Sequence, residues 1–336
     1  MRSAMRLVPR CPPRGGDAAP ATTPRPIHQT LMLRVPHDLL GREVDLGEIR
    51  VTSDMIGAYM RAVGDPATST TPLLEAPPTF CLAVRRAASP SVPLPADMFS
   101  VHGGHDLEFH QPIRAGERYA IRGCVADVFD KMGRTGRLTV IVSEVRITDG
   151  RGTLATRLLE RMIVRPRPPA GARAQEIGPD AESPQTDGEG LPLPPAEAQH
   201  AAAPGDVDLG LELGPHRRGT PDADAIAAYA RSVDTEESLF RNPAWARALG
   251  FRDVLVPGPM LSAFLEHFVR GQLPSWSLER LSTTFRVPTI TGDGIVLSGV
   301  VTEHHDAADA ERLVCDLVVE HTNGERAVTG TATLRR

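Results

Sequence analysis

An acidic cluster directly follows one helical segment of this 336-residue chain. It consists of Asp234, Glu236 and Glu237, just past a segment of helical spacing that ends at Val233. A carboxyl group held in an apolar site has a raised pKa and can serve as a general acid or base. A solvated surface loop has the same composition. The cluster therefore leaves two interpretations open, an acid–base site and an exposed acidic loop.

Three histidines stand close together in the segment VHGGHDLEFHQP, at positions 102, 105 and 110. Imidazole is a common group for proton transfer near neutral pH. Alternation with Leu107 and Phe109 predicts a strand that turns some of these rings toward the concave face of a sheet. His102 is the candidate for catalysis, and a hydrogen-bonded structural histidine at the start of a strand is the competing interpretation.

Composition argues against several classes of function. Hydrophobic content of 41% and charged content of 24% are typical of globular proteins. A net charge of -5 gives no electrostatic case for nucleic-acid binding. The four cysteines form no CxxC pair, and His304-His305-Asp306 reads as a polar turn, so no metal site is predicted. No segment approaches the roughly 18 consecutive apolar residues of a membrane helix. We expect a cytoplasmic protein without a membrane or nucleic-acid partner.

Two low-complexity segments divide the chain. Residues 1–30 are rich in arginine and proline and predict a disordered tail, while residues 166–206 are rich in Pro, Ala, Gly and acids and predict a flexible linker. The remaining chain forms one unit at 31–165 and a second at 207–336.

These two units resemble each other. Ile56-Gly-Ala-Tyr-Met-Arg-Ala-Val63 aligns with Ile226-Ala-Ala-Tyr-Ala-Arg-Ser-Val233. A later match keeps a constant offset of 176 positions (285 − 109), with the pairs Phe109/Phe285, Pro112/Pro288, Gly116/Gly292 and Gly123/Gly299. Two matches in the same order indicate an internal duplication.

Each unit predicts the same order of elements. Capping residues predict a short helix after Thr52 in the first unit and after Thr220 in the second, and a second helix near Pro77 and near Pro257. Alternating strands then surround the turns Asp149-Gly150 and Asn323-Gly324. Helices followed by consecutive hairpins predict an α+β fold with an antiparallel sheet.

The segments that carry this pattern resemble the MaoC-like dehydratase and hydratase family. The first unit is similar to its FAS1-type N-terminal dehydratase domain through AYMRAVGD, EAPPTF and HGGHDLEFHQPIRAGE. The second is similar to the MaoC-like domain through AYARSVD, NPAWARALGF, VLVPGPML and FRVPTITGD. The resemblance implies two hotdog units, each a sheet wrapped around a central helix, that pair within one chain. It also implies hydration of a 2-enoyl thioester of coenzyme A or a carrier protein, or the reverse dehydration, without a cofactor.

The resemblance also implies where catalytic groups stand. In the family, an Asp and a His five residues apart follow the first helix. Asp65 and Asp234 occupy the Asp position of the two units, but Thr70 and Leu239 stand at the His positions. The chain thus predicts a histidine-poor site in which Asp234 acts with the neighbouring glutamates.

The remaining site residues are assigned to substrate binding. By the resemblance, backbone N–H groups of Gly258 and Met260 at the start of the central helix hold the thioester oxygen. Tyr229 is expected to contact the substrate at the domain edge, and a purely structural role in the core is the alternative. Arg85 and Arg86 end a helix, where they could contact phosphates or only complement the helix dipole.

Three functions stay open at this point. The first is a hydratase or dehydratase with a non-standard site. The second is a non-catalytic acyl-binding subunit that needs a catalytic partner, favoured by the missing histidines and by a first-unit loop about ten residues shorter. The third is a hotdog thioesterase using Asp234 or Glu236. Two units paired within one chain suffice as a monomer, and a homo-oligomer is also open.

Overall fold

The structure is a computed structural model of the whole chain. It describes residues 33, 39–65, 75–85, 90, 92–133, 136–166, 207–235, 240–248, 251–307 and 310–336. The predicted tail and, beyond Pro166, the predicted linker lie outside these residues, so their boundaries stay predictions.

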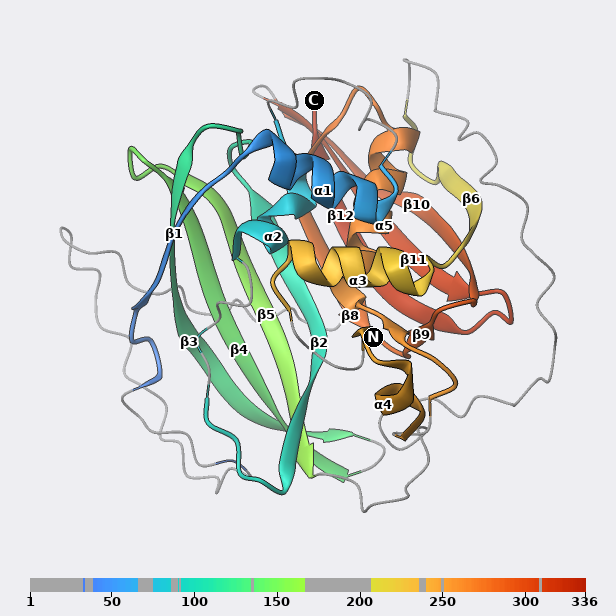
Figure 1. The fold of residues 1–336 in the computed structure, drawn as a ribbon. Helices are drawn as coiled ribbons and strands as arrows, with labels where there is room; N and C mark the ends of the chain where they lie inside the picture. Colours follow the sequence, from blue (N-terminus) through green and yellow to red (C-terminus); the bar gives the residue numbers. More distant parts are fainter. Residues whose placement is uncertain are drawn as a thin grey trace.

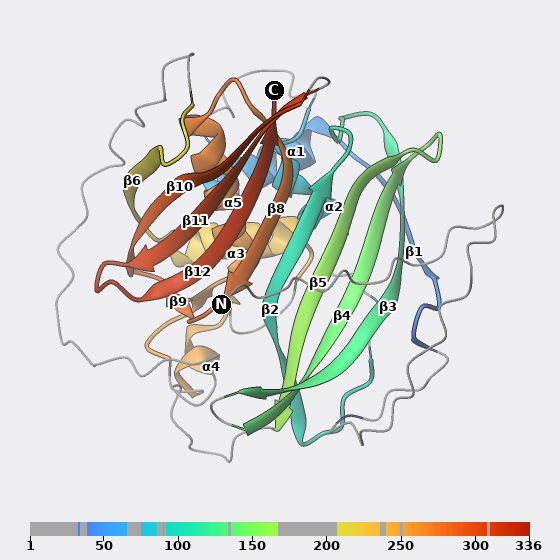
Figure 2. The ribbon, with the colours of Figure 1, turned by 180° about the vertical axis from the view of Figure 1, so that it is seen from behind.

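One ten-stranded antiparallel sheet runs through both units (Figures 1 and 2). The strand order is β1-β3-β4-β5-β2-β8-β12-β11-β10-β6, so each unit supplies five neighbouring strands. The first unit contributes β1 (Val44–Arg50), β2 (Met98–Phe109), β3 (Arg118–Gly133), β4 (Gly136–Asp149) and β5 (Leu154–Pro166). The second contributes β6 (Glu212–Gly219), β8 (Ser277–Phe285), β10 (Gly294–Ala307), β11 (Ala310–His321) and β12 (Arg326–Arg335). A separate short pair joins β7 (Leu255–Val256) to β9 (Thr289–Ile290).

The helices gather on the concave side of this sheet (Figure 1). They are α1 (Ser53–Val63), the 3-10 helix η3 (Pro78–Phe80), α2 (Cys81–Arg85), α3 (Ala223–Ser232), α4 (Pro243–Ala248) and α5 (Gly258–Gln272). Among the described residues no helix combines the length and apolar character needed to cross a membrane.

The predicted helix starts are confirmed by their caps. The Thr52 side chain accepts a hydrogen bond from the Met55 N–H at 3.2 Å, and Asp222 accepts one from the Ala225 N–H at 2.8 Å. Each bond satisfies a donor that the first turn of a helix leaves free. The equivalent helices α1 and α3 pack against each other, with the rings of Tyr59 and Tyr229 5.8 Å apart.

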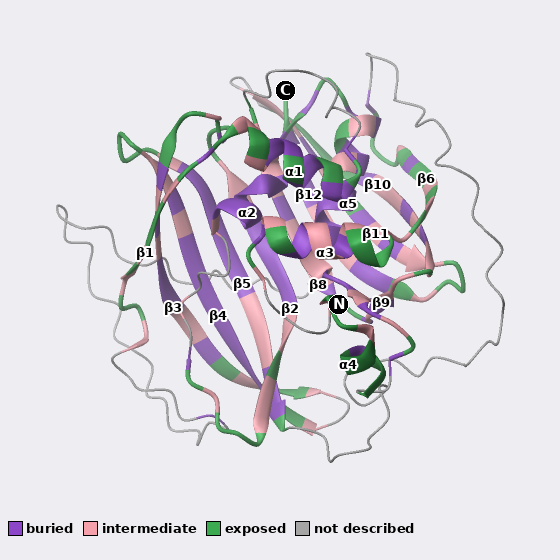
Figure 3. Ribbon diagram, viewed as in Figure 1, coloured by how far each residue is buried: buried purple, intermediate pink, exposed green. Residues whose placement is uncertain are grey.

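The central helices of the two units differ in length. In the second unit α5 runs for 15 residues and buries Met260, Phe264 and Phe268 against the sheet. In the first unit α2 has only five described helical residues after the short turn η3. Inward-facing strand positions are buried in both units (Figure 3). Among the described residues, the concave face of the first unit is therefore covered by less helix than that of the second.

The two halves of the sheet meet where β2 pairs with β8. Asp106 lies opposite Ser282 in this pairing, and the two positions are also related by the repeat offset of 176 (282 − 106). A residue that pairs with its own repeat equivalent marks the pseudo-twofold axis of the duplication. Asp106 accepts hydrogen bonds there from the Ser282 hydroxyl and, at 2.6 Å, from Arg161, which also donates to the Thr283 carbonyl.

A β-bulge disturbs β2 directly beside this seam. The pairing with β5 shifts between His102 and Gly104, which leaves Gly103 as the extra residue. A Cβ on Gly104 would stand 2.2 Å from the Thr283 carbonyl oxygen, and its φ is +146°. Gly104 therefore lets the bulge fit against the second unit, while a Cβ on Gly103 would meet the Ile163 side chain of the first unit at 2.7 Å.

The close contact at Gly104 yields a stability prediction. Gly104→Ala forces a methyl group into the β8 backbone, so we expect it to lower the free energy of unfolding by at least about 2 kcal/mol more than Gly116→Ala. Gly116 also has a positive φ, +88°, but its added Cβ would meet nothing within 4 Å, so it isolates the backbone strain. Urea-induced unfolding followed by circular dichroism measures the difference. Equal losses for the two variants would contradict the role assigned to the seam.

Candidate functional site

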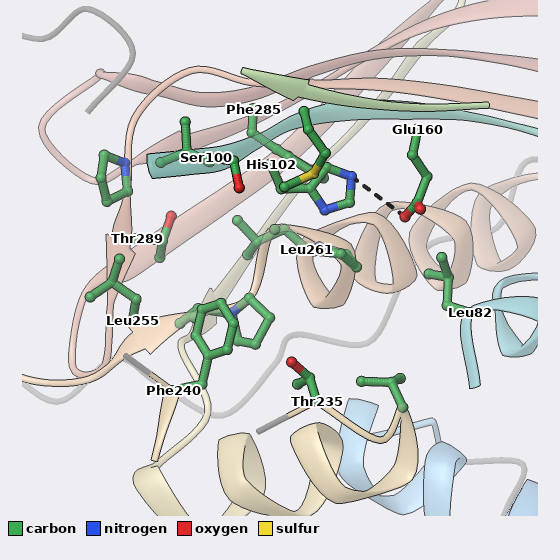
Figure 4. Close-up of a pocket in the computed structure, with 18 of the residues that line it drawn as sticks. Leu82, Ser100, His102, Glu160, Thr235, Phe240, Leu255, Leu261, Phe285 and Thr289 are labelled. Carbon is green, nitrogen blue, oxygen red and sulfur yellow. Dashed lines mark ion pairs between the residues drawn. The ribbon is translucent and has the colours of Figure 1, made fainter. Parts of the chain in front are cut away.

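A cavity of about 450 Å³ lies between the two units (Figure 4). Its second-unit wall is the start of α5 and the end of α3, and its first-unit wall is α2 with the inner face of β2, β4 and β5. Most of the lining is apolar, including Leu82, Met162 and Leu261. A concave, mainly apolar site with a few polar groups is typical of a small-molecule or acyl-group pocket.

The start of α5 presents Gly258 to the cavity. A Cβ at this position would lie 2.8 Å from the ring of Phe285, so only glycine fits beneath that ring. Pro259 has no N–H, and the Met260 N–H donates to the Pro257 carbonyl at 2.9 Å. Of these first three residues, Gly258 alone has an N–H without a hydrogen-bond partner in the described part of the chain. The α5 macrodipole adds positive potential at this point.

A carboxylate and an imidazole face the same cavity from the first unit. Glu160 on β5 forms an ion pair with Arg85 of α2, with 3.0 Å between the Oε2 and Nη1 atoms. Its other oxygen lies 3.9 Å from Nε2 of His102 (Figure 4). Nε2 of His102 is also 3.2 Å from the Gly104 carbonyl oxygen. Because a carbonyl only accepts, this contact favours the tautomer with hydrogen on Nε2 and a free lone pair on Nδ1.

The His102 ring reaches this position because of the bulge. Without the extra residue, strand alternation would place His102 and His105, three residues apart, on opposite faces. With it, the two rings lie 5.5 Å apart, and both pack edge-on against Phe285. Phe285 thus touches His102 on one side and the Gly258 position on the other.

Loss of solvent contact favours the neutral form of both histidine rings. It lowers the pKa of His102 to about 4, with Glu160 acting in the opposite direction and Arg85 in the same one. Burial also lowers the pKa of His105 well below its usual value, and neither ring nitrogen of His105 has a hydrogen-bond partner in the described part of the chain. Both rings are therefore neutral at pH 7.

The structure does not bring Asp234 to this cavity, contrary to the expected acid–base role. The chain leaves α3 through a left-handed conformation at Asp234, with φ of 55°, and the side chain is exposed. The next residue, Thr235, lines the cavity instead. Glu236 and Glu237 lie outside the described residues, so their assignment stays a prediction.

Two further predicted residues also lie away from the cavity lining. Asp65 is buried beside α5, where its Oδ1 is 3.9 Å from Nδ1 of His267. Met260 points into the core, and its N–H is used by Pro257, so it is not an oxyanion donor in this structure.

The other assigned residues lie either at the cavity or outside the described residues. Tyr229 and Arg85 line the cavity, as do His102 and Gly258. Arg86 falls outside the described residues and remains a prediction.

Glu160 is the site residue that the sequence analysis missed. It stands in RLLERMIV, where Leu158, Met162 and Val164 face the concave side. An acid at an inward-facing position of such a strand is costly unless it is paired or functional. The inward-facing position of Glu160 was therefore the sequence signal that could have identified it as a site residue.

In the described residues there is no cluster of histidine, cysteine and acidic side chains suited to a metal ion.

Comparison with known proteins places this geometry in a family. Residues 38–157 match the model of the FAS1-like dehydratase domain region. Those residues are similar to a FAS1-like dehydratase domain. This agrees with the predicted MaoC-like resemblance and covers most of the first unit. The comparison with curated protein sequences gave no match.

Solved structures extend the likeness to the whole double hotdog fold. A MaoC-like dehydratase superposes with a TM-score of 0.65 at 17% identity, covering 88% of this chain and 98% of that one. A putative MaoC domain dehydratase from Chloroflexus aurantiacus gives 0.63 at 14% identity, with coverages of 88% and 95%. A Mycobacterium tuberculosis protein described as having a double hotdog fold gives 0.56 at 16% identity, with 88% and 96%. The predicted α+β fold of two hotdog units paired within one chain is confirmed.

The half-buried His102 and the buried His105 yield a prediction for stability against pH. An unfolded histidine binds a proton below about pH 6.5, whereas folded His102 does so only near pH 4. The unfolded chain therefore takes up more protons in this window, and the free energy of unfolding falls as the pH drops from 6.5 toward 4.

His102→Gln removes one of these groups and should flatten this pH dependence of the melting temperature between pH 7 and 5. The exposed His110 provides the matched control, His110→Gln, which removes a histidine without touching the cavity. Thermal unfolding at several pH values compares the slopes. Identical slopes for wild type and His102→Gln would contradict the half-buried, neutral state of His102.

Proposed function

We propose that this protein adds water to 2-enoyl thioesters, or removes it from 3-hydroxyacyl thioesters, in the cavity between its two units. The observation that carries the proposal is that the His102–Glu160 pair and the Gly258 N–H face one cavity. Hydration needs a group that moves a proton and a donor that holds the thioester oxygen as enolate charge develops. The likeness to dehydratases supports the same reaction class.

The roles follow from the geometry. The thioester oxygen accepts a hydrogen bond from Gly258 at the positive end of α5. Neutral His102 takes a proton from water while the hydroxyl oxygen bonds to C3 of the acyl group. The resulting imidazolium is stabilised by Glu160 and returns the proton to C2, so that one water is added in all. Dehydration runs through the same steps in reverse.

Space for the acyl group is available under the first unit. The cavity passes beneath β2, β4 and β5, where the short α2 leaves the sheet less covered than α5 does in the second unit. An acyl chain that starts at Gly258 would therefore run past His102 into the first-unit wall.

A second function is supported by one specific observation. The exposed Asp234 turns the predicted loop carboxylate away from the cavity. If the loop residues are required for chemistry, the cavity can only hold an acyl group for a catalytic partner. Turnover therefore has to be tested together with binding.

Replacing the proposed proton-transfer pair should abolish most activity. We expect His102→Gln and Glu160→Gln to lower kcat for hydration of crotonyl-CoA and a longer 2-enoyl-CoA by about 100-fold or more, the usual contribution of acid–base groups. Loss of enoyl absorbance measures the rate, and exposed His110→Gln is the control. Loss of activity in Asp234→Asn with retention in His102→Gln would contradict the assignment. Thioester binding without turnover in the wild type would favour the acyl-binding subunit.

The low pKa of His102 also predicts the pH profile. A base acts only in its neutral form, so kcat/KM should rise with pH through about 4 and stay flat from pH 5 to 7. A histidine with an ordinary pKa would lose half its activity near pH 6.5. Steady-state hydration rates over this range distinguish the two, and an acidic limb centred near pH 6.5 would exclude His102 as the base.

A further inference from the structure

The Tyr229 hydroxyl is a polar group that the proposed reaction does not use. Tyr229 is fully buried and lines the cavity from α3. Its hydroxyl has no hydrogen-bond partner in the described part of the chain. Leaving such a buried group without a partner destabilises the protein, and a ligand atom at the right place would recover this loss.

Tyr229 stands on the second-unit wall of the cavity, near polar groups of the first-unit wall. The charge of Arg85 is close enough to lower the pKa of the Tyr229 hydroxyl, which burial raises. Arg85 in turn holds Glu160 at 3.0 Å. Glu160 and Leu82 lie at the end of the view opposite Leu255 and Thr289 (Figure 4). Polar groups thus interrupt a wall that is otherwise mostly apolar.

The order of contacts along the cavity wall places Glu160 and Arg85 beyond the reacting carbons of the acyl group. From Gly258 the wall passes to the Phe285 ring, and from that ring to His102, 5.1 Å away between centroids. Glu160 follows at 3.9 Å from His102, and then Arg85. An acyl group whose carbonyl is at Gly258 and whose C3 is at His102 therefore has its next carbons beside this patch.

The repeat-equivalent tyrosine has different surroundings. Tyr59 is also buried but does not line the cavity. Its hydroxyl has polar neighbours in Thr79 and Glu266, and Thr79 itself donates to Glu266 at 2.8 Å. Neither hydroxyl has a hydrogen-bond partner in the described part of the chain, and of the two tyrosines Tyr229 is the one that lines the cavity.

We propose that Tyr229 donates a hydrogen bond to a neutral oxygen, a keto or hydroxyl group, carried by the acyl chain beyond C3. The site then selects oxygenated 2-enoyl thioesters over hydrocarbon ones of the same length. The oxygen is neutral because Arg85 is already balanced by Glu160, and a second carboxylate there would leave a buried uncompensated charge. This inference rests on the proposed function and names its substrate class.

A matched pair of substrates tests the selection. The coenzyme A thioesters of hex-2-enoic acid and 5-oxohex-2-enoic acid differ only by the oxygen on C5. For the wild type we expect kcat/KM to be about tenfold higher for the oxo compound, the worth of one buried hydrogen bond. In Tyr229→Phe this ratio should fall to about one. In the matched control Tyr59→Phe the ratio should stay at the wild-type value.

Binding separates failure of this inference from failure of the proposed function. Calorimetry with the saturated hexanoyl and 5-oxohexanoyl thioesters gives the same comparison in the absence of any turnover. If no protein hydrates either substrate but Tyr229→Phe still removes a binding preference for the oxo compound, the proposed reaction is wrong and the subsite stands. Equal binding of the two thioesters by the wild type, or equal loss of preference in both tyrosine variants, overturns the subsite.

Discussion

The pairing of β2 with β8 is the contact on which the arrangement of the molecule depends. It joins two five-stranded halves into one sheet and fixes the pseudo-twofold axis between Asp106 and Ser282. Backbone pairing alone sets the register, and the Asp106 carboxylate adds bonds to Ser282 and Arg161 from either side of the seam. A slip of one residue would turn every inward side chain of one half outward. The cavity, which takes its walls from both halves, exists only in this register.

On the two sides of that axis the sheets of the two halves are similar, but the described helices cover their concave faces to different extents. The 15-residue α5 occupies the concave face of the second unit, whereas the described part of α2 in the first unit has five residues and borders the cavity. The start of the long helix and the open face of the short one border the same cavity. Phe285 connects the two walls, because its ring touches both His102 and the Gly258 position.

Much of the fold could be predicted from the sequence, because its signals are local. The cap at Thr52 and the hairpins around Gly150 and Gly324 depend on neighbouring residues only. The duplication was visible as a constant offset of 176 positions between matching residues. In the structure Asp106 and Ser282, which have this offset, pair at the pseudo-twofold axis. The site was harder, since Glu160, His102 and Gly258 are far apart in the sequence and meet only through the seam.

Two features of the site could not be predicted from local sequence patterns. Strand alternation cannot place His102 and His105 on one face, because the bulge at Gly103 depends on packing against the neighbouring strands. Asp234 was expected at the site from its position after α3, but a left-handed backbone there turns its side chain to solvent.

Joining unlike halves in one chain has a further effect. In a dimer of identical subunits any substitution occurs twice, whereas here Tyr59 and Tyr229 can differ in surroundings and use. Because the cavity takes its two walls from unlike halves, the proposed thioester site is built once in each chain.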